Sequence, residues 1–388
     1  MRILYLDLNI RYHNNTRNLI PSLLNIYNEV DIYGPGYSSN DELEKGVEAF
    51  YEKNGPYDFV CSNEHISVFF VEKANNFDDY MTYLNNAFYF NFEIHQKHLY
   101  NMSNFYKSVT NVTKILFLME FDRYWFPKYR EELLLELDAY IVGYGKQFAK
   151  KSEDCPYQKN EAFYKHVNNN WYNFVQKYSK VIQLIHFIDP AEFFWGDISD
   201  RPYECSVPGT GYWARKLAFE NLSLSKIKMP TNFHNKIYFI LSKLGIKSYS
   251  NRLMLYNYNQ LFNNLIEDSK AAFTCGSGNE QPIRKFFEIP AKGTVLLCLP
   301  FHGFEEMGFQ HNENCIICHP NEIVAYVEQL KREQKNAERI SINGRKFIFE
   351  THSIFSRAQQ LQQAFNAIIN SSFVGTRWER GKFIVDEK

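Results

Sequence analysis

The chain has 388 residues, of which 45% are hydrophobic, 22% charged and 17% aromatic, and this length predicts two domains. Lys and Arg total 43 and Asp and Glu total 44, so the net charge of −1 argues against a protein that binds nucleic acid by bulk phosphate neutralisation. No apolar run reaches the roughly 18–20 residues that span a bilayer, and Asp7 interrupts the N-terminal stretch where a signal peptide would be apolar. We therefore expect a cytoplasmic protein.

Residues 1–187 alternate between short apolar runs and amphipathic stretches. An apolar run at 2–8 is followed by a polar loop, a periodic stretch at 19–27 and a second apolar run at 30–33. Strand, helix and strand within about 35 residues is the pattern of a βαβ unit. Further strands are expected at 58–61, 114–119, 139–142 and 181–185, with a helix at 130–138. This alternation predicts a parallel sheet with helices on both faces.

A second alternating set begins near residue 188. Strands are expected at 203–207, 271–275, 294–299 and 315–318, with a strand or buried helix at 236–240. Helices are expected at 213–222, 261–268, 283–291, 322–333, 336–349 and 353–369. The sequence thus predicts an α/β protein with two Rossmann-like doubly wound domains, 1–187 and 188–352. A C-terminal helix and tail, 353–388, follow, and a return of this tail to the first domain is left open.

The segment from Ala272 to Gly293 is the stretch most typical of a ligand site. A predicted strand runs into a loop that contains Gly276 and Gly278, and Pro282 follows at the expected start of a helix. Free backbone N–H groups and the positive end of a helix dipole favour a phosphate at such a position. Because ligands of open α/β sheets bind at the carboxyl ends of strands, we expect a two-substrate cleft here between the two sheets.

Two carboxylates and two cations lie in the same segment. Glu280 falls just before the expected helix and Glu288 falls two turns into it. The first carboxylate can reach sugar hydroxyls and the second can accept hydrogen bonds from a ribose diol, while the helix start faces a diphosphate. Arg284 and Lys285 add positive charge near the same end.

This segment resembles the donor-site signature of GT-B glycosyltransferases, in which seven residues separate two glutamates. It is most similar to the spore-maturation-type, or group 1, branch, whose C-terminal part reads Arg-x-Phe-Glu-x-x-Ala-x-Gly. The chain has Arg284-Lys-Phe-Phe-Glu288-Ile-Pro-Ala291-Lys-Gly293, with one extra residue after the arginine. The order of later residues at 309–318, 321–322, 344–345 and 351–357 is also similar. The resemblance covers about residues 180–360 and is architectural before them.

The resemblance implies roles for these residues in binding a nucleotide sugar. Glu288 would hold the donor ribose, and Glu280 would face the donor sugar. A cation would stabilise the leaving diphosphate in place of a metal, with Arg215 as the first candidate and Arg284 and Lys247 as the next. The remaining candidates for contact with the donor lie in two glycine-containing loops: Gly209, Gly211, Gly278, Asn279 and Gln281.

The first domain is expected to hold the acceptor and any catalytic base. Asp122 follows a predicted strand and is a candidate general base. His13, in the polar loop after the first strand, is a second candidate, although the glycine pair common in relatives is missing from this loop. His186 is expected to be a packed histidine at a strand end. Each of these polar residues also fits an ordinary loop or core position.

We interpret the sequence as a glycosyltransferase that moves a sugar from a nucleotide sugar, with a UDP-sugar favoured, to a glycan, lipid-linked or protein acceptor. No Asp-x-Asp motif occurs, so we expect metal-independent transfer without a cofactor. The paired glutamates favour retention of anomeric configuration. A non-catalytic nucleotide- or glycan-binding relative, or a sugar-nucleotide epimerase of the same fold, is the alternative. Peripheral membrane contact is left open.

Overall fold

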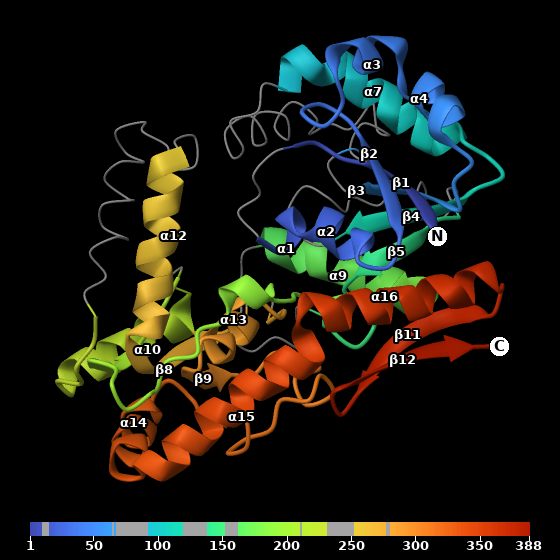
Figure 1. Ribbon diagram of the computed structural model, residues 1–388. Coiled ribbons are helices and arrows are strands. Elements are labelled where there is room, and N and C mark those ends of the chain that lie inside the picture. Colours follow the sequence, from blue (N-terminus) through green and yellow to red (C-terminus); the bar gives the residue numbers. More distant parts are fainter. Residues whose placement is uncertain are drawn as a thin grey trace.

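A computed structural model of the chain describes residues 1–9, 15–63, 66, 92–118, 138–151, 162–209, 212–230, 252–276 and 280–388. Two parallel β-sheets, each accompanied by helices, occupy different halves of the chain (Figure 1). The predicted α/β class with two Rossmann-like units is confirmed. The expected elements at 130–137 and 236–240 lie outside the described residues.

The first sheet has the strand order β2-β1-β3-β4-β5-β6, and all its pairs are parallel. Both faces of its central strands are buried, and for this reason they read as continuous apolar runs in the sequence. The strands are β1 (Arg2–Leu6), β2 (Glu29–Tyr33), β3 (Phe59–Asn63), β4 (Thr113–Leu118), β5 (Tyr140–Gly143) and β6 (Val181–Ile182).

The helices of the first half are α1 (Asn15–Asn18), α2 (Ile20–Asn25), α3 (Asn40–Lys45), α4 (Val47–Asn54), α7 (Phe92–Ser108) and α9 (Ala162–Lys177). Helix α3 begins with a capping box, because the Ser39 hydroxyl accepts from the Glu42 N–H at 3.3 Å and the Glu42 carboxylate accepts from the Ser39 N–H at 2.9 Å. Helices α3, α4, α7 and α9 were not expected from the sequence.

The second sheet has the order β10-β9-β8-β7, again all parallel. Its strands are β7 (Tyr203–Ser206), β8 (Ser269–Cys275), β9 (Val295–Leu299) and β10 (Ile316–Ile317). The accompanying helices are α10 (Trp213–Leu224), α12 (Arg252–Glu267), α13 (Lys285–Ala291), α14 (Ile323–Arg332) and α15 (Gln334–His352). A short 3₁₀ turn, η3 (Pro190–Glu192), follows the passage from the first half to the second.

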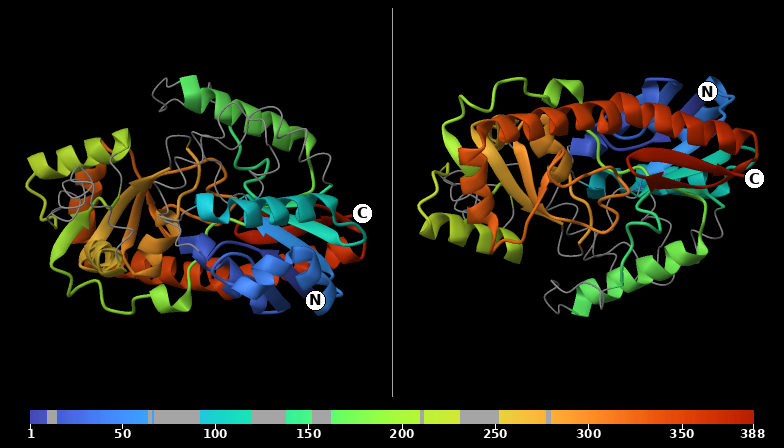
Figure 2. Two further views of the ribbon diagram at one scale, coloured as in Figure 1. Left: turned by 90° about the horizontal axis from the view of Figure 1, so that it is seen from above. Right: turned by 90° about the horizontal axis from the view of Figure 1, so that it is seen from below.

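The C-terminal segment returns to the first sheet. Helix α16 (Ile354–Ile369) runs along this sheet (Figure 2), and Phe365 stacks on Phe59 of β3 with ring centres 4.6 Å apart. The hairpin of β11 (Phe373–Glu379) and β12 (Lys382–Glu387) then forms a separate two-stranded sheet beside β6, where the hydroxyl of Thr376 accepts from the Gln183 N–H at 2.7 Å.

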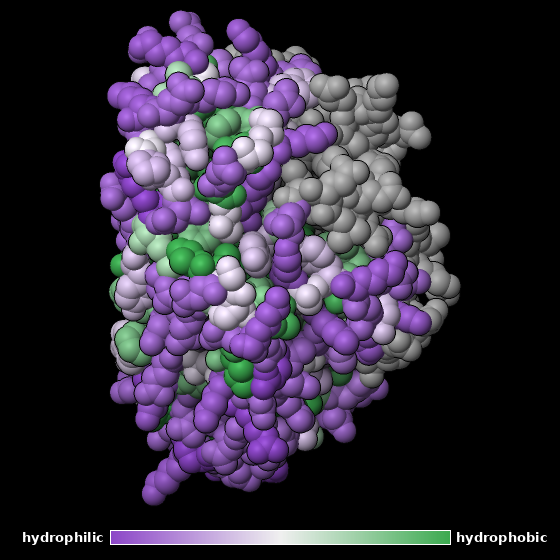
Figure 3. Space-filling model, turned by 90° about the vertical axis from the view of Figure 1, so that its right-hand side faces the viewer, coloured by the Kyte–Doolittle hydropathy of each residue, from purple (hydrophilic) through white to green (hydrophobic). Residues whose placement is uncertain are grey.

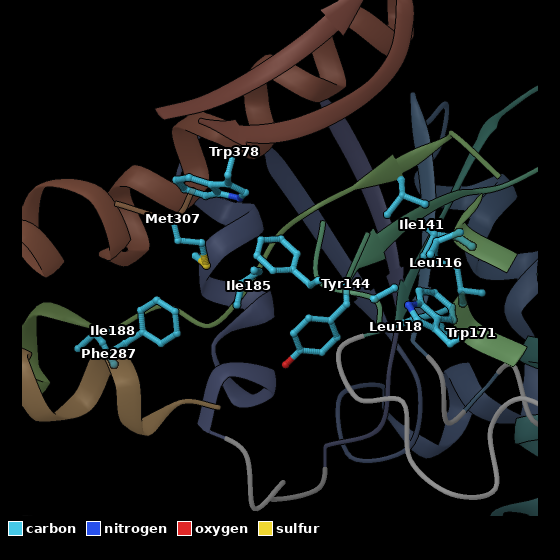
Figure 4. Packing of buried hydrophobic residues seen from close by; sticks show 14 of the residues in the cluster. Leu116, Leu118, Ile141, Tyr144, Trp171, Ile185, Ile188, Phe287, Met307 and Trp378 are labelled. Atoms are coloured by element: carbon cyan, nitrogen blue, oxygen red, sulfur yellow. The ribbon is translucent and has the colours of Figure 1, made fainter. Parts of the chain in front are cut away.

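The two passages of the chain between the halves lie side by side. The Ile188 N–H donates to the His352 carbonyl at 3.1 Å, and the Ile354 N–H donates to the Ile188 carbonyl at 2.9 Å. Around this junction one continuous apolar cluster joins Tyr144 and Ile188 to Phe287 of α13 and Trp378 of β11 (Figure 4). The junction is therefore a packed interior and not a solvated linker.

The outer surface is mostly polar. On the face shown in Figure 3, hydrophobic residues of the described part form small, separate patches among hydrophilic ones. Within the described ranges, no helix is both long enough and apolar enough to cross a membrane.

Candidate active site

Three residues converge where β7 and β8 end, and we call Gly209, Arg215 and Lys285 the cation cradle. Gly209 has a φ of +93°, and a Cβ built on it would lie 2.2 Å from Lys285 Cε and 3.1 Å from Arg215 Nη1. Any other residue at 209 would push the end of the lysine side chain away, and the φ of this position favours glycine as well. The glycine therefore leaves room for two cations at one point of the strand-end edge.

Arg215 lies in the first turn of α10, and its side chain is almost completely buried. Nη2 donates to the Cys275 carbonyl at the end of β8 at 3.3 Å, and the guanidinium lies 4.9 Å from the centre of the Tyr212 ring. Burial lowers the pKa of Arg215, but an arginine keeps its charge at every physiological pH. The named contacts orient the guanidinium and leave its charge in place.

Lys285 is the first residue of α13 and is half-buried. Its ammonium lies 5.2 Å from the centre of the Phe262 ring, and no described carboxylate is within ion-pair distance of it. Burial and the nearby Arg215 charge lower the pKa of Lys285 to about 8. Sequence reasoning treated this lysine only as an additional cation, since nothing in the sequence pairs it with Gly209 and Arg215.

Arg284, the neighbouring residue, is held between two carboxylates, and we call Glu192, Arg284 and Glu288 the Arg284 clamp. Nη2 contacts Glu192 Oε1 at 2.7 Å and Oε2 at 2.8 Å, and Nη1 bonds Glu288 Oε1. Burial opposes the charge on Arg284, but Glu288 and Glu192 outweigh it and raise its pKa. The N–H groups of Arg284 thus point at protein carboxylates. Contact of Arg284 with the nucleotide sugar stays a prediction.

Glu288 lies in the first turn of α13, not two turns into the helix as the sequence indicated. The helix begins at Lys285, and the Pro282 carbonyl just before it accepts from the Tyr144 hydroxyl at 3.1 Å. Burial disfavours the charged form of Glu288, but Arg284 and Lys285 together lower its pKa. Glu288 is therefore an ionised hydrogen-bond acceptor beside the cation cradle.

Glu280 lies at the close of the loop between β8 and α13. Its φ is 53°, and a Cβ on Gly276 would lie 3.0 Å from the Glu280 backbone, so the loop returns tightly on itself. Glu280 Oε2 accepts from the Lys150 ammonium at 3.0 Å, and Lys150 belongs to the first half of the chain. Glu280 Oε1 is buried and has no hydrogen-bond donor among the described residues.

His186 connects the first half of the chain to the same loop. Its Nδ1 lies 3.1 Å from the Thr16 hydroxyl and its Nε2 lies 3.1 Å from the Tyr144 hydroxyl. Because the single Tyr144 proton bonds the Pro282 carbonyl, we infer that Nε2 carries the ring proton and Nδ1 accepts from Thr16. Burial and the Arg284 charge lower the pKa of His186 to about 3, so the ring is neutral.

Several predicted site residues lie outside the described residues: His13, Asp122, Gly211, Lys247, Gly278 and Asn279. Gln281 is half-buried beside Glu280. At the edge of the first sheet, sequence reasoning missed Asp7 and Asn63, whose side chains bond each other where β1 and β3 end. Among the described residues, no group of three or more His, Cys, Asp or Glu side chains is arranged to hold a metal ion.

The fold and one segment of the chain are similar to known proteins. The fold is similar to that of HepE from Anabaena, solved in complex with UDP, with a TM-score of 0.50, 11% identity, and coverage of 95% of this chain and 100% of that chain. Residues 248–363, which include both glutamates and Lys285, match the family model described as glycosyl transferase-like. The chain has the fold of GT-B glycosyltransferases.

Two further solved structures resemble this chain. Sucrose-phosphate synthase from Thermosynechococcus elongatus has 12% identity and a TM-score of 0.49, and the match covers 96% of this chain and 100% of that chain. A glycosyltransferase from Rickettsia africae has 12% identity and a TM-score of 0.48, with 96% of this chain and 99% of that chain covered. No curated protein matches the chain significantly in sequence.

Proposed function

We propose that this protein is a glycosyltransferase that transfers a sugar from a nucleotide sugar, with a UDP-sugar as the favoured donor, to a glycan, lipid-linked or protein acceptor. The observation that carries this proposal is the cation cradle. Arg215 and Lys285 meet at the strand-end edge of the second sheet, with Glu288 one turn away on α13. Two cations beside a carboxylate suit a ligand that has both a diphosphate and a ribose diol.

The cradle supports a reaction without a metal ion. Transfer breaks the bond between the anomeric carbon and the diphosphate oxygen, and negative charge then accumulates on the departing diphosphate. Arg215 and Lys285 are already in place to stabilise that charge. We therefore propose that turnover does not depend on a divalent cation, and that EDTA leaves the rate unchanged.

Glu288 supports recognition of the nucleoside half of the donor. Its carboxylate is ionised, fixed by Arg284 and still 17% exposed, so it can accept hydrogen bonds from two neighbouring hydroxyls. UDP as the diphosphate is proposed because HepE, which has a similar fold, was solved in complex with UDP. Retention of anomeric configuration is proposed from the spacing of Glu280 and Glu288, and the anomer of the product, read by NMR, tests it.

The decisive experiment measures turnover of UDP-glucose, UDP-galactose, UDP-N-acetylglucosamine and GDP-mannose by nucleotide release, with and without EDTA. Glu288→Ala is expected to weaken UDP binding and lower turnover by at least about tenfold, because a charged acceptor is lost. Glu350→Ala is the matched control, since that glutamate lies on the surface of α15 with 60% of its side chain exposed. Unchanged binding and turnover in Glu288→Ala would show that the donor binds elsewhere.

Two outcomes would indicate a function other than sugar transfer. Binding of UDP without turnover of any donor, across a panel of sugar acceptors, would identify a non-catalytic relative of the fold. Release of a free monosaccharide of altered configuration, in place of a glycoside, would identify an epimerase.

A further inference from the structure

Residues 144–150, directly after β5, contact the second domain around the loop between β8 and α13, which we call the donor loop. The Tyr144 hydroxyl donates to the Pro282 carbonyl at 3.1 Å. A Cβ on Gly303 would lie 2.7 Å from the Phe148 ring and 2.9 Å from the Gln147 carbonyl, so the two backbones approach closely. The loop that carries Glu280 is therefore held from the opposite domain.

Lys150 is the charged contact in this segment. Its ammonium lies 3.0 Å from Glu280 Oε2, with 26% of the lysine side chain and 16% of the glutamate side chain exposed. Partial burial reduces screening of this ion pair by solvent and salt. One carboxylate oxygen of Glu280 is thereby committed to the first domain, while the buried Oε1 has no donor among the described residues.

The cation cradle and the Arg284 clamp differ from this pair in origin. Apart from Glu192 on η3, where the chain enters the second half, their members belong to α10, α13 and the loops beside β7 and β8. A nucleotide held there needs no residue of the first domain. The orientation of Glu280, in contrast, depends on Lys150 and hence on the two domains meeting as they do in this structure.

We propose that Lys150 is a positioning residue for the donor sugar: it fixes Glu280 across the domain boundary so that Oε1 accepts a sugar hydroxyl. This inference rests on the proposed function and assigns different parts of donor recognition to the two domains. Nucleotide affinity is set within the second domain, whereas recognition of the sugar requires a lysine from the first. Lys150 then affects turnover of a nucleotide sugar without affecting the binding of its nucleotide.

The test compares Lys150→Met, Lys150→Arg and the control Lys146→Met, whose lysine is exposed in the same segment. The probes are UDP, by calorimetry, and the nucleotide sugar of the four-member panel that wild-type protein uses best. Lys150→Met is expected to lower kcat/KM by about tenfold to a hundredfold, as expected for a misplaced contact group, while the Kd for UDP changes by less than about twofold. Lys150→Arg is expected to recover most of the activity.

A charge exchange separates positioning from simple stabilisation of the domain contact. The double variant Lys150→Glu with Glu280→Lys keeps an ion pair and is expected to recover the melting temperature lost by either single change, but not turnover. The role of Lys150 would be overturned if turnover recovered in the double variant. It would also be overturned if Lys150→Met lost UDP affinity and turnover equally, or if its kcat/KM were unchanged. Wild-type protein that neither binds UDP nor turns over any donor would overturn the proposed function itself, and the role of Lys150 with it.

Discussion

Arg284 and Lys285 are adjacent in the sequence, yet they lie in regions of opposite electrostatic character. In the Arg284 clamp, two carboxylates surround one buried guanidinium at 2.7–2.8 Å on the Glu192 side. In the cation cradle, Lys285 faces Arg215 and the ring of Phe262, with no described carboxylate in ion-pair distance. In the first region the carboxylates outnumber the single cation, and the second region has positive charge in excess.

This difference shows why counting cations near a helix start does not identify an anion site. The guanidinium of Arg284 is compensated from a glutamate 92 residues earlier in the chain. Lys285 keeps an unbalanced charge because the Gly209 loop brings a second cation to it. An anion gains most where the protein has left charge unpaired, and the following variants test whether the two regions divide their roles in this way.

The largest expected effect follows from removing the buried cation of the cradle. Arg215→Ala should lower kcat/KM for the nucleotide sugar by about a hundredfold to a thousandfold, as loss of a pre-placed group that stabilises a leaving charge does. Lys216→Ala is the control, because this lysine is the exposed neighbour on α10. Steady-state kinetics measure kcat/KM, and circular dichroism checks that the variant is folded. A folded Arg215→Ala variant with normal kcat/KM would show that the cation cradle takes no part in the reaction.

Breaking the clamp should act on folding first. Arg284→Met leaves Glu192 and Glu288 facing each other without a cation, and we expect the free energy of unfolding to fall by about 3 kcal/mol. Urea denaturation measures this loss, and Glu192→Gln added to Arg284→Met should restore part of it. If stability is unchanged while donor affinity collapses, Arg284 contacts the donor directly, as the sequence indicated.

Lys285→Met should weaken UDP binding by about tenfold at neutral pH, because one charge-assisted contact is lost. The pH dependence gives a sharper result. Free Lys285 loses its charge as the pH rises through about 8, so binding a diphosphate above that pH requires proton uptake. Wild-type affinity should then fall by about tenfold in total between pH 8 and pH 10, and the affinity of Lys285→Met should not. Calorimetry from pH 6 to pH 10 tests this; parallel curves would contradict it.

The smallest effect is expected at the domain junction. Tyr144→Phe removes the hydroxyl that joins His186 to the Pro282 carbonyl and leaves both without this partner. The free energy of unfolding should fall by about 1–2 kcal/mol, the cost of an unmade buried hydrogen bond. Urea denaturation of Tyr144→Phe beside Tyr27→Phe, an exposed tyrosine, provides the measurement. Equal stabilities would mean that the hydrogen bonds from Thr16 through His186 and Tyr144 to Pro282 do not hold the donor loop.

The strands could be predicted because both faces of a parallel sheet are buried. The expected strand at 294–299 differs from β9 by one residue at its start, and the expected strand at 114–119 differs from β4 by one residue at each end. Helices α7 and α9 were missed because asparagine and aromatic residues blur their periodicity. The capping box at Ser39, in contrast, was a readable signal for α3 that the sequence interpretation did not use.

The candidate site could be predicted only in part, for a physical reason. The glutamates, the glycines and Arg215 lie in local patterns, so their residue types and spacing are visible. The clamp and the Lys150 contact join side chains 92 and 130 residues apart, and only the folded chain decides which charges neutralise each other. That Lys285 and not Arg284 has the unbalanced charge is a property of packing.

The return of α16 to the first sheet has a consequence for synthesis on the ribosome. One face of that sheet is covered by Leu361 and Phe365, which emerge only after the whole second domain has been made. During synthesis, Phe59 and its neighbours therefore remain exposed to solvent or to a chaperone. The first domain to be translated is thus completed last, and a nascent chain stalled before residue 354 should display an uncovered hydrophobic sheet.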